Sequence, residues 1–137
     1  MLRAETKTRA RALQLLYAWD IGSEPTMAKV AYRLMESDAR TSKSFGTAET
    51  LASGVIDNVD QLDAEIRASA DNWRFERIGV VERNILRLAL HEIRSGTAPV
   101  AVVIDEAVRL AHWFAGPKAP AFVNGVLDGV ARRLGYL

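Results

Sequence analysis

The chain has 137 residues, of which 49% are hydrophobic and 26% charged, and its formal net charge is +1. Such values are typical of one soluble globular domain, and the small net charge argues against bulk attraction to nucleic acid. The chain has no cysteine, which excludes disulfides and thiolate metal sites.

Helical periodicity runs through almost the whole chain, and glycine and proline gather in a few short breaks. In the first helix, Leu13, Leu16 and Tyr17 form the apolar stripe, and Pro25 begins the second. Seven helical segments in one small domain predict an all-α bundle. The predicted helices span residues 4–20, 25–38, 48–59, 60–70, 80–94, 100–114 and 121–134.

The stretch "APAFVNGVLDGV" near the C-terminus contains both a turn signal and a helical pattern. Asn124-Gly125 is a common turn dipeptide, yet the apolar spacing continues to Leu134. We therefore expect a helix in which Gly125 and Gly129 face the same way and let a neighbouring helix approach closely. Asn124 is expected to bond a backbone group across that contact.

Catalytic constellations are weak in this sequence, and no catalytic, metal or cofactor site is predicted. His91 and His112 lie on different helices without a partner at a recognised metal spacing, which is typical of packing or surface histidines. Asp105 and Glu106 are adjacent on a helix, so they point about 100° apart and do not converge on one substrate atom. They are expected to lie in a solvated first turn.

Positive charge gathers at the start of the first helix, where one acid, Glu5, stands among four basic residues of the first eleven: Arg3, Lys7, Arg9 and Arg11. Three of them, Arg3, Lys7 and Arg11, are four residues apart and form one basic stripe. A short basic run is also typical of a merely solvated helix end.

Arg9 differs from the stripe because it lies four residues before Leu13, in line with the apolar face. It is therefore expected to project just past the edge of the core. Tyr17 and Trp19 follow one or two turns later and offer stacking surfaces beside the phosphate-binding cations. This combination favours single-stranded nucleic acid.

A second candidate surface lies around the loop "AGPKAPA". Phe114 and Phe122 flank this loop, which contains Lys118. The two rings either close the core or form a partly exposed aromatic pair beside a cation, again an arrangement that suits base stacking.

Four segments resemble the NusB family of bacterial transcription antitermination and ribosomal-RNA biogenesis factors. They are "RARALQLLYAWD", "ERIGVVERNILRLALHEI", "VVIDEAVRLAHWF" and "FVNGVLDGV", and together they cover nearly the whole chain. The resemblance implies one domain over residues 1–137, with seven helices in two small subdomains and no catalysis.

The resemblance also implies partners. The family binds the boxA element of ribosomal-RNA leader transcripts jointly with NusE, a small-subunit ribosomal protein. That pair joins NusA, NusG and RNA polymerase in a complex that reads through terminators. Members include monomers and dimers, so the resemblance does not determine whether this chain forms a homodimer. The chain lacks a signal peptide and an apolar run of about 18 residues, so we expect a cytoplasmic protein without a membrane segment.

Site residues follow from the resemblance by position. The family's basic motif falls on Lys7, Arg9 and Arg11, to which Arg3 is added, and its first-helix tyrosine falls on Tyr17. The aromatics that border the RNA fall on Phe114 and Phe122, with Lys118 between them. The face that meets NusE falls on Glu82, and its neighbour Arg83 is a weaker candidate.

Two departures from the family pattern bear on RNA binding. Glu5 and Thr6 stand where other members have a denser arginine run, which predicts modest affinity for RNA alone. Lys118 lies in a stretch where members often have an acid and a serine. Two other functions stay open from the residues: an accessory domain of a ribosomal-RNA methyltransferase, and a helical adaptor that binds only proteins.

Overall fold

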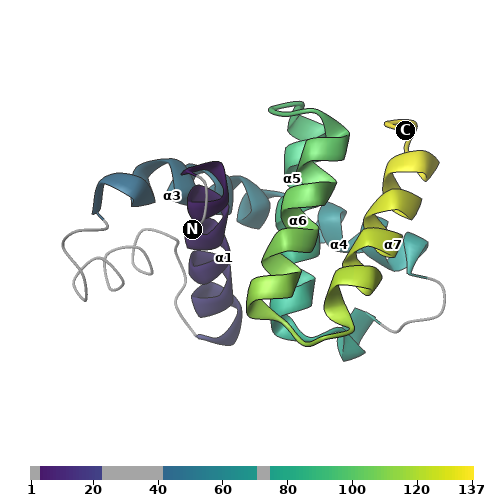
Figure 1. The fold of residues 1–137 in the computed structure, drawn as a ribbon, viewed down its shortest axis with the longest axis horizontal. Coiled ribbons are helices and arrows are strands. Elements are labelled where there is room, and N and C mark those ends of the chain that lie inside the picture. The colour runs from purple at the N-terminus through teal and green to yellow at the C-terminus, as the bar shows by residue number, and fades with distance from the viewer. Residues whose placement is uncertain (1–3, 23–41, 71–74) are drawn as a thin grey trace. The chain divides into compact units, whose positions relative to one another are not determined.

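The computed structural model describes residues 4–22, 42–70 and 75–137 (Figure 1). The described residues form six α-helices and one 3-10 turn and contain no strand, so the predicted all-α class is confirmed. The helix predicted over residues 25–38 lies outside them. The chain divides after Asp57 into two compact units. No helix in the described ranges is long and apolar enough to cross a membrane.

The described part of the first unit consists of two packed helices, α1 (Ala4–Ile21) and α3 (Ser42–Asp57). Leu15 and Leu16 of α1 and Val55 of α3 are completely buried. The helix α3 begins six residues before the predicted start at residue 48. The added stretch contains Ser42, Ser44, Gly46 and Thr47, which are poor helix formers. Their helix penalties are nevertheless small, a few tenths of a kcal/mol for serine and threonine and about 1 kcal/mol for glycine.

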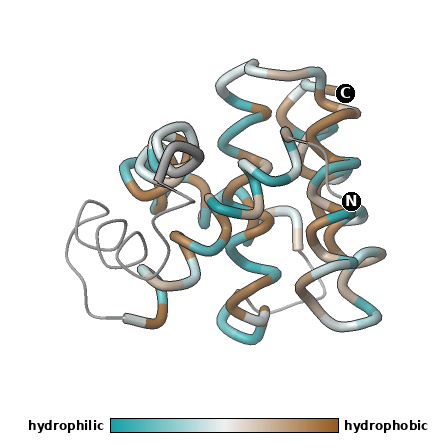
Figure 2. Tube along the Cα trace, turned by 60° about the vertical axis from the view of Figure 1, so that its left-hand side comes forward, coloured by the Kyte–Doolittle hydropathy of each residue, from teal (hydrophilic) through white to brown (hydrophobic). Residues whose placement is uncertain are grey.

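The second unit contains four α-helices and the 3-10 turn. Within it, α5 and α7 pack on each other, and each also packs on α4 and on α6 (Figure 1). Leu86, Leu110 and Leu127 are among its fully buried side chains. In Figure 2, hydrophobic and hydrophilic residues alternate along the helices, as expected where one face of each is buried. The elements are α4 (Val59–Ser69), η2 (Phe75–Arg77), α5 (Val80–Ser95), α6 (Val100–Phe114) and α7 (Ala119–Arg133).

Glycine and proline end and begin these helices as the sequence indicated. Gly96 follows α5 with a left-handed φ of 67°, and its N–H donates to the carbonyl oxygens of Glu92 at 3.0 Å and Ile93 at 3.3 Å. Pro99 precedes α6, and a proline lies in the first turn of α7. As a result, the predicted ranges of α5 and α6 agree with the structure to within one residue.

The glycines of α7 correct one prediction. The stretch is helical, as expected, but a Cβ at Gly125 or Gly129 would meet no heavy atom within 4 Å. Asn124 is exposed, whereas Leu127 is buried. Gly125 lies about 200° around the helix from Leu127, so it faces away from the core. The predicted close helix approach at these glycines is therefore wrong, and so is the packing role expected for Asn124.

Candidate functional site

The basic start of α1 places some of its cations on an open face. Lys7 is exposed and Arg11, one turn later on the same face, is half-buried. Tyr17 is 42% exposed, so its predicted place in the apolar stripe with Leu13 and Leu16 is wrong, although this exposure suits a stacking role. Trp19 is half-buried. Arg3 lies outside the described residues. The exposed part of the basic stripe is therefore Lys7 with the accessible portion of Arg11.

Arg9 does not belong to that face. Its side chain is only 8% exposed, so the expectation that it projects past the edge of the core is wrong. Thr6, Arg9, Leu13 and Leu16 follow one another at helical spacing and all are buried. The buried face therefore begins one or two turns before Leu13 and includes Arg9, which lies about 160° around the helix from Lys7.

The loop between α6 and α7 brings Lys118 and Phe122 together. Lys118 is exposed at the N-cap of α7, and its carbonyl oxygen accepts from the N–H of the half-buried Phe122 at 3.3 Å. Phe114, at the end of α6, is 48% exposed. Two accessible rings thus flank this loop and its cation, and of the two rings Phe122 lines the cavity beside the loop and Phe114 does not.

An open cavity of about 390 Å³ lies beside this loop, with mostly apolar walls. Lys118 and Phe122 line this cavity together with Glu82. The predicted RNA surface at the loop and the predicted NusE face therefore meet at one cavity. Arg77 of η2 and the two residues after it were not predicted for the site, since the irregular stretch "RFERIG" shows no periodicity. The lining includes Arg77, Ile78, Gly79 and Glu82 from η2 to α5, and Gly116, Lys118 and Phe122 from the loop and the start of α7.

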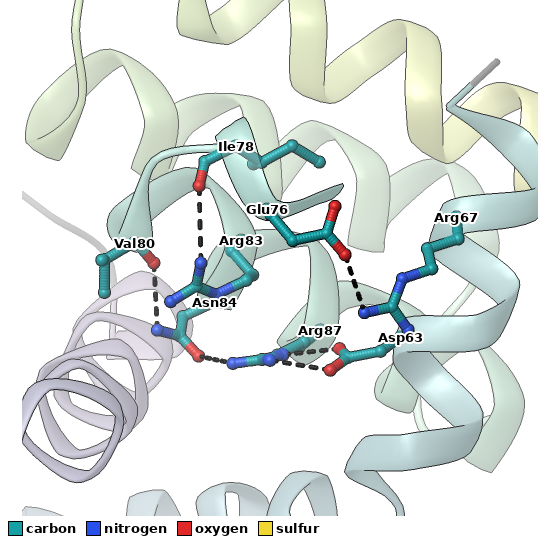
Figure 3. A network of polar contacts seen from close by, with 8 residues as sticks. All are labelled: Asp63, Arg67, Glu76, Ile78, Val80, Arg83, Asn84 and Arg87. Atoms are coloured by element: carbon teal, nitrogen blue, oxygen red, sulfur yellow. Dashed lines mark hydrogen bonds and ion pairs between the residues drawn. The ribbon is translucent and has the colours of Figure 1, made fainter. Parts of the chain in front are cut away.

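Glu82 is half-buried in the first turn of α5, where its negative charge complements the helix dipole. Its carboxylate lies against Gly79, the N-cap residue of the same helix. Arg83 points elsewhere: its Nη1 donates to the carbonyl oxygen of Ile78 at 3.5 Å (Figure 3). Of the two predicted partner-face residues, only Glu82 lines the cavity.

The cavity wall at η2 is held by arginines around one buried ring. The guanidinium carbons of Arg67, Arg87 and Arg83 lie 4.4, 5.6 and 5.9 Å from the ring centre of Phe75, within the range of cation–π attraction. Arg67 also forms an exposed ion pair with Glu76 at 3.3 Å. These contacts fix the short turn that comes before Ile78 and Gly79.

Beneath this turn lies a buried ion pair between α4 and α5 (Figure 3). Arg87 donates to both carboxylate oxygens of Asp63, through Nε at 2.7 Å and Nη2 at 2.8 Å. Its Nη1 donates to Asn84 Oδ1 at 3.1 Å, and Asn84 Nδ2 donates to the carbonyl oxygen of Val80 at 3.0 Å. The network links α4 to the first turn of α5, where Glu82 lies.

The remaining polar candidates show no catalytic geometry. Asp105 is exposed and pairs with Arg109 at 3.6 Å, but Glu106 is 1% exposed, so the expected solvated position is wrong for Glu106. The two carboxylates diverge, as predicted. Burial lowers the pKa of the half-buried His91, with Arg94 acting in the same direction and Glu92 against it. No three His, Asp or Glu side chains gather into a metal-binding group in the described ranges.

The match to known proteins extends over most of the chain. A model of the NusB family matches residues 6–132. The transcription antitermination protein NusB of Sulfurovum sp. is 39% identical over 126 residues, which are 92% of this chain and 96% of that protein. The NusB of Solibacter usitatus is 36% identical over 135 residues, or 97% and 92% of the two chains.

Solved structures show the same similarity in three dimensions. A chain from the crystal structure of antitermination factors NusB and NusE in complex with dsRNA matches with a TM-score of 0.83 at 27% identity. The match covers 97% of this chain and 99% of that chain.

Proposed function

Because this chain belongs to the NusB family, we propose that it is a non-enzymatic transcription antitermination factor. In this role it binds boxA RNA of ribosomal-RNA leader transcripts together with NusE, and joins NusA, NusG and RNA polymerase in the cytoplasm. The observation that supports the proposal most directly is the agreement in fold, over 97% of the chain, with one chain from a crystal structure of NusB and NusE in complex with dsRNA.

Two surfaces are proposed to contact the RNA, one on each unit. On α1, the exposed Lys7 and the half-buried Arg11 supply charge for phosphates, and Tyr17 supplies a ring. Arg9 is left out of the contact set because a guanidinium in a side chain only 8% exposed offers little surface to a phosphate. No role is assigned to Arg3, which lies outside the described residues.

The second RNA surface follows the loop between α6 and α7. Lys118 supplies a cation there, and Phe114 and Phe122 supply rings, with Phe114 48% exposed. Rings and a cation on one edge suit a single strand, because every base has a face that can stack and every nucleotide a phosphate. This surface borders the cavity that contains Glu82, so the proposed RNA and NusE contacts adjoin one another on this unit.

Lys7→Ala should weaken the binding of a single-stranded boxA-like RNA and reduce the magnitude of the log–log salt slope by roughly 0.7, the share of one phosphate. Because Lys7 is exposed, the helical content should stay unchanged. Fluorescence anisotropy across a salt series measures both the affinity and the slope. Arg132→Ala, which also removes one exposed positive charge, is the matched control.

Equal losses in the two variants, or an unchanged slope in Lys7→Ala, would remove the α1 stripe from the RNA site. The same titrations with a duplex of the boxA sequence test the form of the RNA. Tighter binding of the duplex than of the single strand would contradict the stacking role given to Tyr17 and Phe122.

Glu82→Lys should lower the affinity for NusE by about tenfold or more, because it places a third cation in a cavity already lined by Arg77 and Lys118. Calorimetric titration with purified NusE measures the loss, and thermal unfolding checks the fold. Asp105→Lys makes the same charge change at an exposed position on α6 and should leave the titration unaltered. An equal loss in both variants would refute the position given to the partner face.

A further inference from the structure

The carboxylate of Glu82 occupies space that the glycine at position 79 leaves open. A β-carbon built on Gly79 would overlap Glu82 Oε2 and lie 3.1 Å from Glu82 Cδ. The end of the Glu82 side chain therefore occupies the space where any other residue would have its side chain. Both residues line the cavity.

The position of the Glu82 carboxylate depends on the open space at Gly79 and not on a capping hydrogen bond. Glu82 is the third residue of α5, from which a carboxylate can reach back to the N-cap residue. Yet no side-chain hydrogen bond caps this end of α5, all of whose residues are described. The carboxylate lies close to the helix N-terminus, where the dipole favours it, and it comes this close because the N-cap residue is glycine.

The backbone itself does not demand a glycine here. Gly79 has φ of −58° and ψ of 152°, a conformation that every L-residue adopts readily. An alanine at this position is therefore compatible with the fold, and the group that must move is the far end of a flexible side chain. Because Gly79 is the N-cap of α5 and alanine is a poorer N-cap, the substitution should also lower the stability of the protein. That cost does not depend on Glu82, so a comparison with and without Glu82 separates it from the displacement of the carboxylate.

We propose that Gly79 is a positioning residue: because it has no side chain, the Glu82 carboxylate can lie at the cavity edge, in the place where a protein partner meets it. The inference rests on the proposed role of Glu82 in binding NusE. A methyl group at position 79 displaces the carboxylate from the α5 N-terminus. The partner then meets the negative charge at a different point of the cavity.

Gly116 offers a matched control in the same cavity. It lines the cavity from the loop between α6 and α7, and a Cβ there would meet no heavy atom within 4 Å. Gly116→Ala and Gly79→Ala therefore add the same methyl group to two segments of one cavity lining, but only the second displaces Glu82.

The experiment compares five proteins: the wild type, Gly79→Ala, Gly116→Ala, Glu82→Ala and the double variant with alanine at positions 79 and 82. In the free chain, the side-chain carboxyl carbon resonance of Glu82 should shift in Gly79→Ala and stay in place in Gly116→Ala. In titrations with NusE, Glu82→Ala should weaken binding by roughly two- to fivefold, the range of a partly exposed ion pair. Gly79→Ala should produce part of that loss in the presence of Glu82 and none in its absence.

The outcomes separate the inference from the function on which it rests. An unshifted Glu82 resonance in Gly79→Ala overturns the inference, as does an affinity loss that persists when Glu82 is alanine. If Glu82→Ala weakens binding and Gly79→Ala does not, the inference alone is wrong. If Glu82→Ala leaves the titration unchanged, the proposed partner face is wrong and the inference falls with it.

Discussion

Arg87→Met should lower the free energy of unfolding by about 3–5 kcal/mol. The Arg87 and Asp63 side chains are only 6% and 12% exposed, so the substitution leaves the Asp63 carboxylate buried without its partner. Asn84 Oδ1 loses a donor at the same time. Urea unfolding followed by circular dichroism at neutral pH measures the loss.

Two further variants show whether the unpaired charge is the cause. Arg132→Ala breaks an exposed pair with Asp128, whose side chains are 66% and 44% exposed, and should cost no more than about 1 kcal/mol. Combining Arg87→Met with Asp63→Leu should recover much of the loss, because no charge is then left buried. A double variant as unstable as Arg87→Met alone would contradict this explanation.

Leu127→Ala and Gly125→Ala should change the stability in opposite directions, although both residues lie in the motif "FVNGVLD". Leu127 is completely buried, so its truncation should cost about 2–5 kcal/mol. Gly125 faces open space within a helix, so an added methyl group meets nothing and should stabilise the protein by about 0.5–1 kcal/mol. Urea unfolding of both variants under identical conditions measures the difference.

A destabilised Gly125→Ala would show that a neighbouring element approaches this face of α7 after all. Gly129→Ala serves as an internal check, because its Cβ position is equally open. The two alanine variants should therefore behave alike.

The helices of the second unit could be predicted from the sequence because their signals are local. The apolar period and the flanking Gly96 and Pro99 determine where α5 and α6 end and begin. The same local signals were insufficient at Gly125, since a glycine that permits close packing and one that faces solvent look identical in a single sequence. Only the position of the helix within the bundle distinguishes them.

The candidate site was predicted in part. The exposure of Lys7 agrees with the predicted basic stripe, and that of Phe114 agrees with the second of the two alternatives left open for its ring. Tyr17 and Arg9 were misplaced, because Tyr17 was assigned to the apolar stripe and the buried face was taken to begin at Leu13. The cavity was not predicted, since the turn η2 has no periodic pattern and meets the loop before α7 only through the tertiary fold. Asp63 and Arg87 are 24 residues apart, and their pairing likewise depends on how α4 packs on α5.

The buried pair of Asp63 and Arg87 also constrains how the protein can evolve. Replacing either residue alone leaves the other as an unpaired buried charge, which costs several kcal/mol of stability. That loss is a large part of the 5–15 kcal/mol, roughly, by which a typical domain is stable. Single substitutions at either position are therefore expected to be selected against. The apolar pair made by Arg87→Met and Asp63→Leu is two substitutions away, and either single substitution on the way to it leaves one buried charge unpaired.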